Sequence, residues 1–240
     1  MHPRRIMSAQ PQLFAAESYL VRVDVDGAPL EGQLIMPAEP RGIVLFAHGS
    51  GTSRHGPRNK LAAQALRQDV SVGTLLIDLL SPAEDAADAQ TAKLRFDVDL
   101  LASRVLGICD WLARGTRTAG LPIGLFGAST GAAATLSAST KCPNVAAIVS
   151  RGGRPDLLAD AVLGAVRAPT LFIVGGDDPQ VIDLTRRAAQ VMCNVRELTV
   201  IPGAGHLFAE PGKLGEVSQR AAAWFDRHLP RVGESDEPRG

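Results

Sequence analysis

The stretch Ile123-Gly-Leu-Phe-Gly-Ala-Ser-Thr-Gly131 joins an apolar segment to a helical one that is rich in alanine. A turn from a strand directly into a helix is tight, and glycine supplies the clearance and the backbone angles that it needs. In this context the pattern G-x-S-x-G predicts that Ser129 exposes its hydroxyl at the N-terminus of a helix. The five residues also occur by chance, and the serine is then a simple helix cap.

Apolar strands and helical segments alternate around this turn. Before it, Tyr19 to Asp26 and Leu30 to Met36 form an expected antiparallel hairpin across Asp26-Gly27, and the apolar run 42–47 predicts a strand buried on both faces. Right-handed crossovers then imply an α/β fold with a mostly parallel, doubly wound sheet. Further strands are expected at 71–78, 122–126, 145–150, 170–174 and 196–201, and helices at 58–68, 94–114, 130–139, 157–166, 181–192 and 214–228.

We expect one domain at residues 19–230, because no repeat or linker divides the series and 240 residues suit a single α/β unit. Residues 1–18 are expected to form a flexible lead and 231–240 a flexible tail. The segment Ser81 to Ala92, rich in alanine and aspartate, is expected to be a mobile loop. Residues 150–170 are too few for a large lid over a pocket, which favours an open, shallow pocket.

The composition limits the classes of binding partner that we expect. Twenty-five basic and 25 acidic residues give a formal net charge of zero, so no global charge favours nucleic acid or an anionic membrane. Cys109, Cys142 and Cys193 lack metal-ligand spacing and are expected to be small buried residues in a reducing cytoplasm. No apolar run follows the start as in a signal peptide, and none reaches the roughly 20 residues of a membrane span. A small-molecule partner is expected, and the oligomeric state stays open.

A serine hydroxyl is a weak nucleophile until a base accepts its proton. His206 is the candidate base, because it lies in a glycine-rich loop, 202–208, directly after the expected strand that ends at Ile201. The remaining histidines fit this role less well. His2 is terminal, His55 lies in a polar loop and His228 lies near the end of the last helix.

An imidazole base needs a carboxylate that fixes its tautomer and stabilises its charged form. The segment Gly175-Gly-Asp177-Asp178-Pro-Gln-Val181 follows another expected strand. Asp178 is favoured because it stands at the turn just before the next helix, while Asp177 stays an alternative. Ser129, Asp178 and His206 then follow in one chain order, each just past a parallel strand, at the sheet edge where open α/β folds bind ligands.

The loop His48-Gly-Ser50-Gly51 follows the first buried strand. Its backbone amides can point at a developing oxyanion, and we expect Ser50 N–H, with Gly51 as the next choice, to act beside Thr130 N–H. His48 is expected to orient this loop through hydrogen bonds. A metal-ligand role for His48 lacks the converging His, Cys or carboxylate partners that a site would need, so no metal is expected.

Arg54 and Arg58 lie near the His48 loop, and Arg151 follows the expected strand at 145–150. They could bind an anionic group of a substrate. The alternative is that they pair with carboxylates of the aspartate-rich segment and hold the rim together, and the sequence does not decide between the two.

On these motifs the chain is similar to the α/β-hydrolase superfamily over roughly residues 19–229, and its short length and His48-Gly-Ser-Gly loop resemble the dienelactone hydrolase branch. The resemblance implies a carboxylic ester or lactone hydrolase that works through an acyl-enzyme, without a cofactor. With no large lid, its pocket is expected to suit small acyl groups. Dienelactone hydrolases proper carry a cysteine nucleophile, whereas the matching residue here is Ser129, which implies a serine esterase of that branch. A peptidase, thioesterase or C–C hydrolase with the same triad, or a catalytically silent binding protein, stays open, as do the acyl and alcohol groups.

Overall fold

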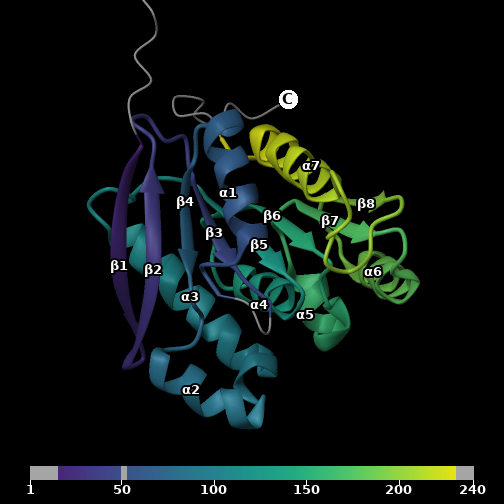
Figure 1. The fold of residues 1–240 in the computed structure, drawn as a ribbon, viewed down its shortest axis with the longest axis horizontal. Helices are drawn as coiled ribbons and strands as arrows, with labels where there is room; N and C mark the ends of the chain where they lie inside the picture. Colours follow the sequence, from purple (N-terminus) through teal and green to yellow (C-terminus); the bar gives the residue numbers. More distant parts are fainter. Residues whose placement is uncertain (1–15, 50–52, 231–240) are drawn as a thin grey trace, which may run out of the picture.

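The structure is a computed structural model that describes residues 16–49 and 53–230. Within these residues a mixed sheet of eight strands lies between two layers of helices (Figure 1). The strands are β1 Glu17–Val25, β2 Ala28–Met36, β3 Ile43–Ala47, β4 Gly73–Ile77, β5 Ile123–Ala128, β6 Val145–Arg151, β7 Thr170–Gly175 and β8 Arg196–Ile201. The α-helices are α1 Pro57–Val70, α2 Pro82–Thr91, α3 Val98–Arg114, α4 Thr130–Ser139, α5 Asp160–Ala165, α6 Pro179–Val191 and α7 Lys213–His228.

The strand order β1-β2-β4-β3-β5-β6-β7-β8 confirms the predicted fold class. β2 pairs antiparallel with β1 and with β4, and the other neighbouring pairs are parallel. After β3 the chain crosses to β4 on one side and then returns to β5 on the other. The carboxyl ends of β3 and β5 therefore flank the point at which the winding changes direction, where doubly wound sheets form a crevice for ligands.

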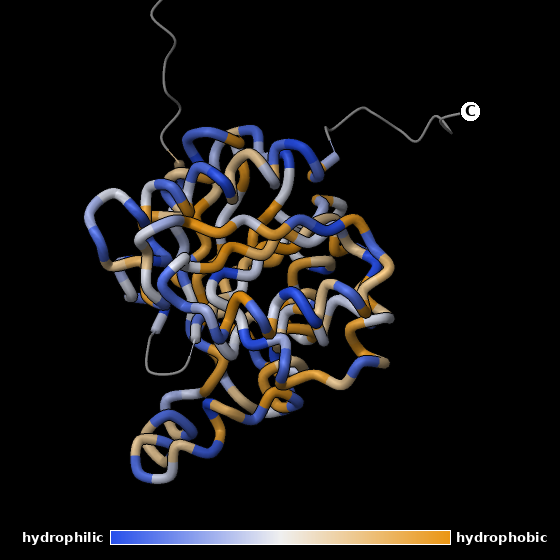
Figure 2. Tube along the Cα trace, turned by 90° about the vertical axis from the view of Figure 1, so that its right-hand side faces the viewer, coloured by the Kyte–Doolittle hydropathy of each residue, from blue (hydrophilic) through white to orange (hydrophobic). Residues whose placement is uncertain are grey.

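Each face of the sheet buries its own apolar cluster. Side chains of α1 and α7 pack on one face, where Phe46 and Phe126 stack with ring centroids 4.8 Å apart. The other face packs against α3 and α4. Figure 2 shows the same layering, with apolar segments running through the interior and hydrophilic segments at the periphery. Strands β3, β4, β5 and β7 are buried along their whole length because both faces of the sheet are covered there, which explains their largely apolar sequences.

The expectation of a mobile loop at 81–92 is wrong, because most of this segment is helix α2. The hydroxyl of Ser81 accepts a hydrogen bond from Glu84 N, and the Glu84 carboxylate accepts one from Ser81 N, which together form a capping box. An ion pair of 2.8 Å between Arg104 and Glu84 ties α2 to α3. The helix lies beyond the carboxyl end of β4, at the bottom of Figure 1.

Smaller departures have local causes. The helix expected at 94–114 is divided into a 3-10 turn, Leu94–Phe96, and α3, because Asp97 caps the first turn of α3 by accepting a hydrogen bond of 3.0 Å from Leu100 N. β1 begins at Glu17, two residues inside the expected lead. The rest of that lead and the expected tail lie outside the described residues. Cys109 and Cys142 are buried as expected, whereas Cys193 is exposed in the turn between α6 and β8.

In the described ranges no helix is long and apolar enough to span a membrane.

Candidate active site

Ser129 lies between the end of β5 and the start of α4 in a strained conformation. Its φ of 52° and ψ of −121° belong to a region that residues with a β-carbon rarely adopt. The backbone holds it from two sides, because Ser129 N donates to Arg151 O at 3.2 Å and Ser129 O accepts from Arg154 N at 3.3 Å. Such strain persists only where the surrounding structure fixes it, and it concentrates at functional sites.

Two glycines make room for this turn. A β-carbon on Gly131 would overlap the carbonyl oxygens of Ala47 and His48, so only glycine lets α4 approach the end of β3. Gly49 comes equally close from the other side, since a β-carbon there would lie 2.9 Å from the β-carbon of Ser129. Gly131 and Gly49 therefore pack the turn at Ser129 against the residues that follow β3.

His206 and Asp178 lie on neighbouring loops that follow β8 and β7. Nδ1 of His206 is 2.8 Å from Oδ2 of Asp178, and the second oxygen of Asp178 accepts a hydrogen bond of 3.3 Å from Val181 N at the start of α6. The two loops are joined by a hydrogen bond from Asp177 N to Ala204 O, at 3.0 Å. Of the two candidate carboxylates, the structure brings Asp178 to the imidazole, while Asp177 is exposed.

Ser129, Asp178 and His206 line one cavity of about 240 Å³. The His206 side chain is 39% exposed and that of Asp178 is 15% exposed, so solvent reaches the imidazole while the carboxylate behind it is largely covered. Gly152, with a φ of 51° that favours glycine, lies against the loop of His206: a β-carbon there would be 3.3 Å from the carbonyl oxygen of His206 and in ordinary contact, at 3.5 Å, with Cε1 of its ring. Within the described residues no hydrogen bond joins the Ser129 hydroxyl to His206, a contact that commonly tightens only when substrate binds.

Of the expected oxyanion donors, only Thr130 lies in the part of the chain that the structure describes. Thr130 is buried and is the first residue of α4, where helix geometry provides no acceptor for its N–H. Its amide therefore points out of the helix beside Ser129. Ser50 and Gly51 lie outside the described residues, so their amides stay predictions.

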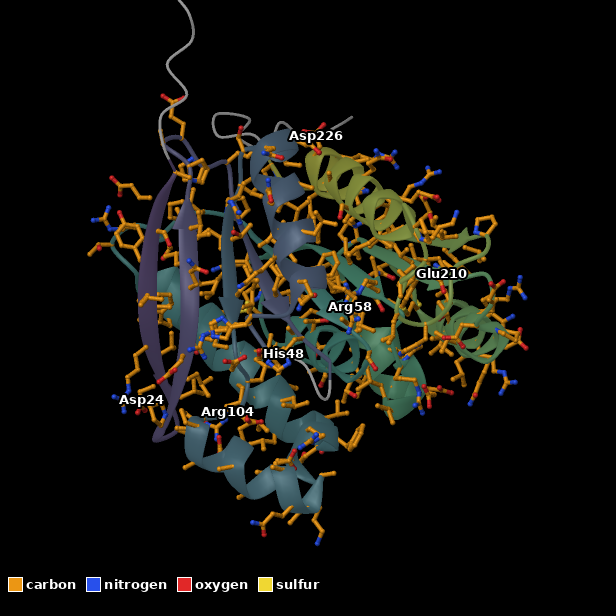
Figure 3. All side chains as sticks on the ribbon, viewed as in Figure 1. Asp24, His48, Arg58, Arg104, Glu210 and Asp226 are labelled. Atoms are coloured by element: carbon orange, nitrogen blue, oxygen red, sulfur yellow. The ribbon has the colours of Figure 1, made fainter. Side chains whose placement is uncertain are left out.

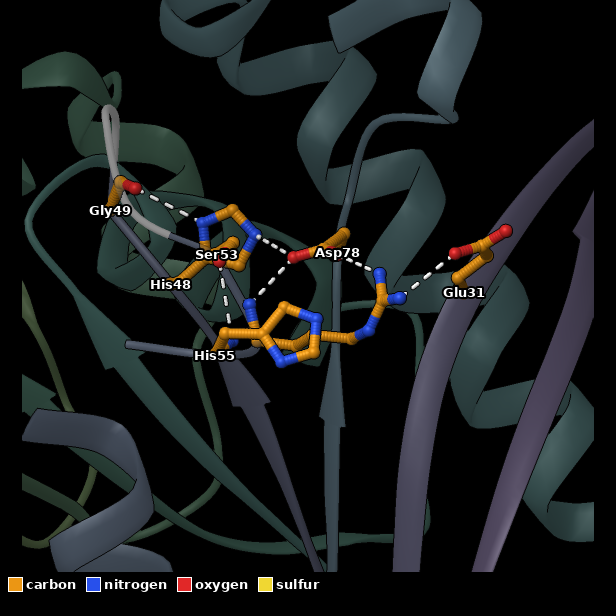
Figure 4. Close-up of polar contacts among 7 residues, drawn as sticks. Glu31, His48, Gly49, Ser53, His55 and Asp78 are labelled. Atoms are coloured by element: carbon orange, nitrogen blue, oxygen red, sulfur yellow. Dashed lines mark hydrogen bonds and ion pairs between the residues drawn. The ribbon is translucent and has the colours of Figure 1, made fainter. Parts of the chain in front are cut away.

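His48 belongs to a network of polar groups at the ends of β3 and β4 (Figure 4). Its Nδ1 lies 3.0 Å from Gly49 O, and its Nε2 lies 3.2 Å from Oδ1 of Asp78. Asp78 also accepts a hydrogen bond of 2.6 Å from Arg54 N and pairs with the Arg54 guanidinium, which reaches on to Glu31 at 2.8 Å. Burial acts to raise the pKa of Asp78, but the hydrogen bonds from His48 and Arg54 outweigh it and lower that pKa.

The three arginines that the sequence analysis singled out differ in their surroundings. Arg54 pairs with Asp78 and Glu31, neither of which belongs to the aspartate-rich segment, so the expected pairing with that segment is wrong for Arg54. The side chains of Arg58 and Arg151 make no hydrogen bond or ion pair with any described residue. Figure 3 labels Arg58 and His48, which line the same cavity as Arg151.

Sequence reasoning missed Asp78 and Gly152. Asp78 follows directly on β4, and its place at the carboxyl edge of a parallel strand was a signal that could have found it. Gly152 lies in Arg151-Gly-Gly-Arg154, directly after β6, where the glycine pair indicates a close approach of another segment.

The described architecture, a mostly parallel sheet of eight strands with a strained serine turn after β5, is an α/β-hydrolase fold. No family model matches the chain. A crystal structure of dienelactone hydrolase from Anabaena variabilis ATCC 29413 is 49% identical to it, with a TM-score of 0.87, over 90% of this chain and 99% of that one. The chain therefore belongs to the dienelactone hydrolase family.

More distant structures share the fold alone. Est1E from Butyrivibrio proteoclasticus is 15% identical, with a TM-score of 0.71 over 86% of this chain and 97% of that one. A cold-adapted esterase from an Arctic intertidal metagenomic library is 16% identical, with a TM-score of 0.70 over 95% of this chain and 97% of that one.

Two curated Mycobacterium tuberculosis proteins, provisionally named phosphoribosyl transferases, are 50% identical to the chain over 216 residues. The match covers 90% of this chain but 47% of theirs, so the chain spans about half the length of these relatives. Their name describes proteins that extend well beyond the matched segment.

Proposed function

We propose that the protein hydrolyses small carboxylic esters or lactones through an acyl-enzyme, with Ser129 as nucleophile, His206 as base and Asp178 as the acid behind it. The observation that carries the proposal is the 2.8 Å contact between His206 Nδ1 and Asp178 Oδ2 in the cavity that Ser129 lines. The family and the strained turn at Ser129 also support it.

In this mechanism Ser129 Oγ attacks the ester carbonyl, and its proton passes to Nε2 of His206. The imidazolium then donates from Nδ1 to the Asp178 carboxylate, which stabilises the charge. The amide of Thr130, with that of Ser50 as the second donor, holds the oxyanion of the tetrahedral intermediate. His206 returns the proton to the leaving alkoxide, and a water molecule activated by His206 hydrolyses the acyl-enzyme and restores the Ser129 hydroxyl.

The test is hydrolysis of p-nitrophenyl acetate, butyrate and dodecanoate by the wild type and by Ser129→Ala, with fluorophosphonate labelling of both. We expect short-chain turnover, and we expect Ser129→Ala to lower kcat by about 10⁴- to 10⁶-fold because the nucleophile and its base act as a unit. Ser137→Ala, on the same helix, is the matched control, since the Ser137 side chain makes no described hydrogen bond.

Each outcome has a distinct meaning. Labelling and turnover that both require Ser129 support the proposal. Labelling at Ser129 without turnover of any ester would leave the nucleophile in place and refute the ester substrates. Turnover that survives in Ser129→Ala would refute the mechanism.

A further inference from the structure

A second cavity lies beside the nucleophile, with a volume of about 770 Å³. It is bounded by the ends of β3 and β4, the start of α1 and helix α2, and Arg151 forms part of its wall. Gly49 belongs to this wall and packs against the β-carbon of Ser129, and the backbone of Arg151 is hydrogen-bonded to Ser129 N. The cavity and the proposed reaction centre are therefore direct neighbours.

The positive charges of this cavity are only partly neutralised. Arg54 pairs with Asp78 and Glu31, and Arg95 pairs with the buried Asp88. These pairs leave Arg58 and Arg151, for which the described part of the chain offers no carboxylate partner. Asp85, on the exposed side of α2, also lines the cavity and pairs with neither of them.

The side chain of Arg151 is unusual because it is buried and yet makes no hydrogen bond with a described residue. Only 9% of the residue's surface is exposed, and its buried Nη1 has no acceptor in the described part of the chain. Its guanidinium lies over the Phe126 ring, 5.8 Å from the centroid. Burial and the neighbouring charge of Arg58 lower the pKa of Arg151 to about 10, so it stays charged at neutral pH. A buried, charged and unpaired guanidinium is costly unless something else supplies the counter-charge.

The start of α1 adds to the positive potential. No side chain caps this helix, its first turn contains no acidic residue, and Arg58 stands at its second position. The first residue of the helix, Pro57, has no N–H, so the amides that helix geometry leaves without an acceptor are those of Arg58 and Asn59. These amides and the helix dipole attract anions, and a cation there is unfavourable on its own.

We propose that Arg58, Arg151 and the start of α1 bind a phosphate monoester group of the substrate, whose ester carbonyl then reaches Ser129. A phosphate monoester carries a charge of about −1.5 to −2 at neutral pH, which matches two unpaired guanidinium groups, whereas a carboxylate would neutralise one of them. The inference deepens the proposed function and rests on it for the position of the ester, while the binding of the anion can be measured without any turnover.

The test is calorimetric titration of the 240-residue chain with phenyl phosphate and with benzoate, in a buffer free of phosphate and sulfate at constant ionic strength. These probes share a ring and differ in the anionic group. We expect phenyl phosphate to bind at least about tenfold more tightly than benzoate. Arg58→Gln and Arg151→Gln should each weaken its binding by about tenfold or more, because each removes charge-assisted hydrogen bonds.

Arg187→Gln is the matched control, because Arg187 is exposed on α6 and has no described partner. If Arg151→Gln does not fold, Arg58→Gln at the half-buried start of α1 provides the same measurement. Equal binding of the two probes would overturn the assignment to phosphate, and unchanged binding in Arg58→Gln would overturn the site.

Inhibition kinetics then test whether the bound anion lies next to the ester in the proposed active site. Phenyl phosphate should inhibit hydrolysis of p-nitrophenyl butyrate competitively, and this inhibition should weaken in Arg58→Gln but not in Arg187→Gln. Non-competitive inhibition would contradict the placement beside the reacting ester. If no ester is hydrolysed while phenyl phosphate binding still requires Arg58, the proposed function fails and the anion site stands.

Discussion

Replacing Asp178 by asparagine and by alanine separates its two contacts. One oxygen, Oδ2, faces His206 Nδ1 at 2.8 Å, and the other accepts a hydrogen bond of 3.3 Å from Val181 N at the start of α6. Asparagine keeps an acceptor for the helix amide but loses the negative charge that favours the Nδ1–H tautomer. We expect Asp178→Asn to lower kcat by about 10⁴-fold, as the loss of this carboxylate does in other serine hydrolases.

The two variants should differ in stability. Asparagine caps a helix about as well as aspartate does, so the melting temperature of Asp178→Asn should stay close to that of the wild type. Alanine removes the cap as well, which should cost about 1 kcal/mol and lower the melting temperature by about 2–4 °C in a chain of this size.

The assay combines p-nitrophenyl butyrate hydrolysis with thermal unfolding followed by circular dichroism. Asp177→Asn is the control, because Asp177 is the neighbouring exposed carboxylate and makes no described side-chain contact with His206. Loss of activity in Asp177→Asn with retained activity in Asp178→Asn would refute the assignment. Equal stability of Asp178→Asn and Asp178→Ala would refute the capping argument.

Three further predictions concern stability, each measured by urea unfolding. Gly131→Ala should destabilise the protein by about 1–3 kcal/mol, because the added β-carbon would overlap two carbonyl oxygens. Gly215→Ala on helix α7 is the control and should stabilise the protein by about 0.4–1 kcal/mol, because a β-carbon there would have no atom within 4 Å. Equal effects of the two substitutions on the free energy of unfolding would contradict the packing argument. The pKa of Asp78 is lowered from 3.8 in the folded state, so the stabilisation from its charged form is complete above that value and is lost as the pH falls through the lowered pKa. The difference in free energy of unfolding between the wild type and Asp78→Asn should therefore shrink below about pH 4. A difference in free energy that does not depend on pH would exclude this linkage. Ser81→Ala should cost about 1 kcal/mol and speed amide exchange in α2, while unchanged exchange would show that the capping box is not needed there.

The sequence predicted the sheet well because its signals are local. The buried strands read as continuous apolar runs, and the turn at Asp26-Gly27 marks the hairpin, so β3, β5 and β1-β2 follow from short stretches of chain. The segment of α2 was misjudged because its alanines and aspartates resemble a polar linker. The signal that decides it, Ser81 followed three residues later by Glu84, was present and overlooked.

The candidate site was predictable in outline for a different reason. Each proposed catalytic residue follows a strand, and the carboxyl ends of parallel strands meet at one edge, so chain order alone places Ser129, Asp178 and His206 together. What the sequence could not show is which charges remain unpaired. Arg54 and Arg58 are four residues apart, yet Arg54 meets two carboxylates and Arg58 meets none, because that outcome depends on the paths of β2 and β4.

The backbone angles of Ser129 lower the stability of the folded protein at the residue that we propose as the nucleophile. A residue with a β-carbon held at φ 52° costs the folded state about 1–3 kcal/mol, and glycine escapes most of that cost. Ser129→Gly should therefore be inactive and yet fold at least as stably as Ser129→Ala. If Ser129 acts as the proposed nucleophile, substitution by glycine in a lineage that no longer needed the reaction would carry little or no penalty in stability, so only selection for the proposed hydrolysis would keep a serine in this turn.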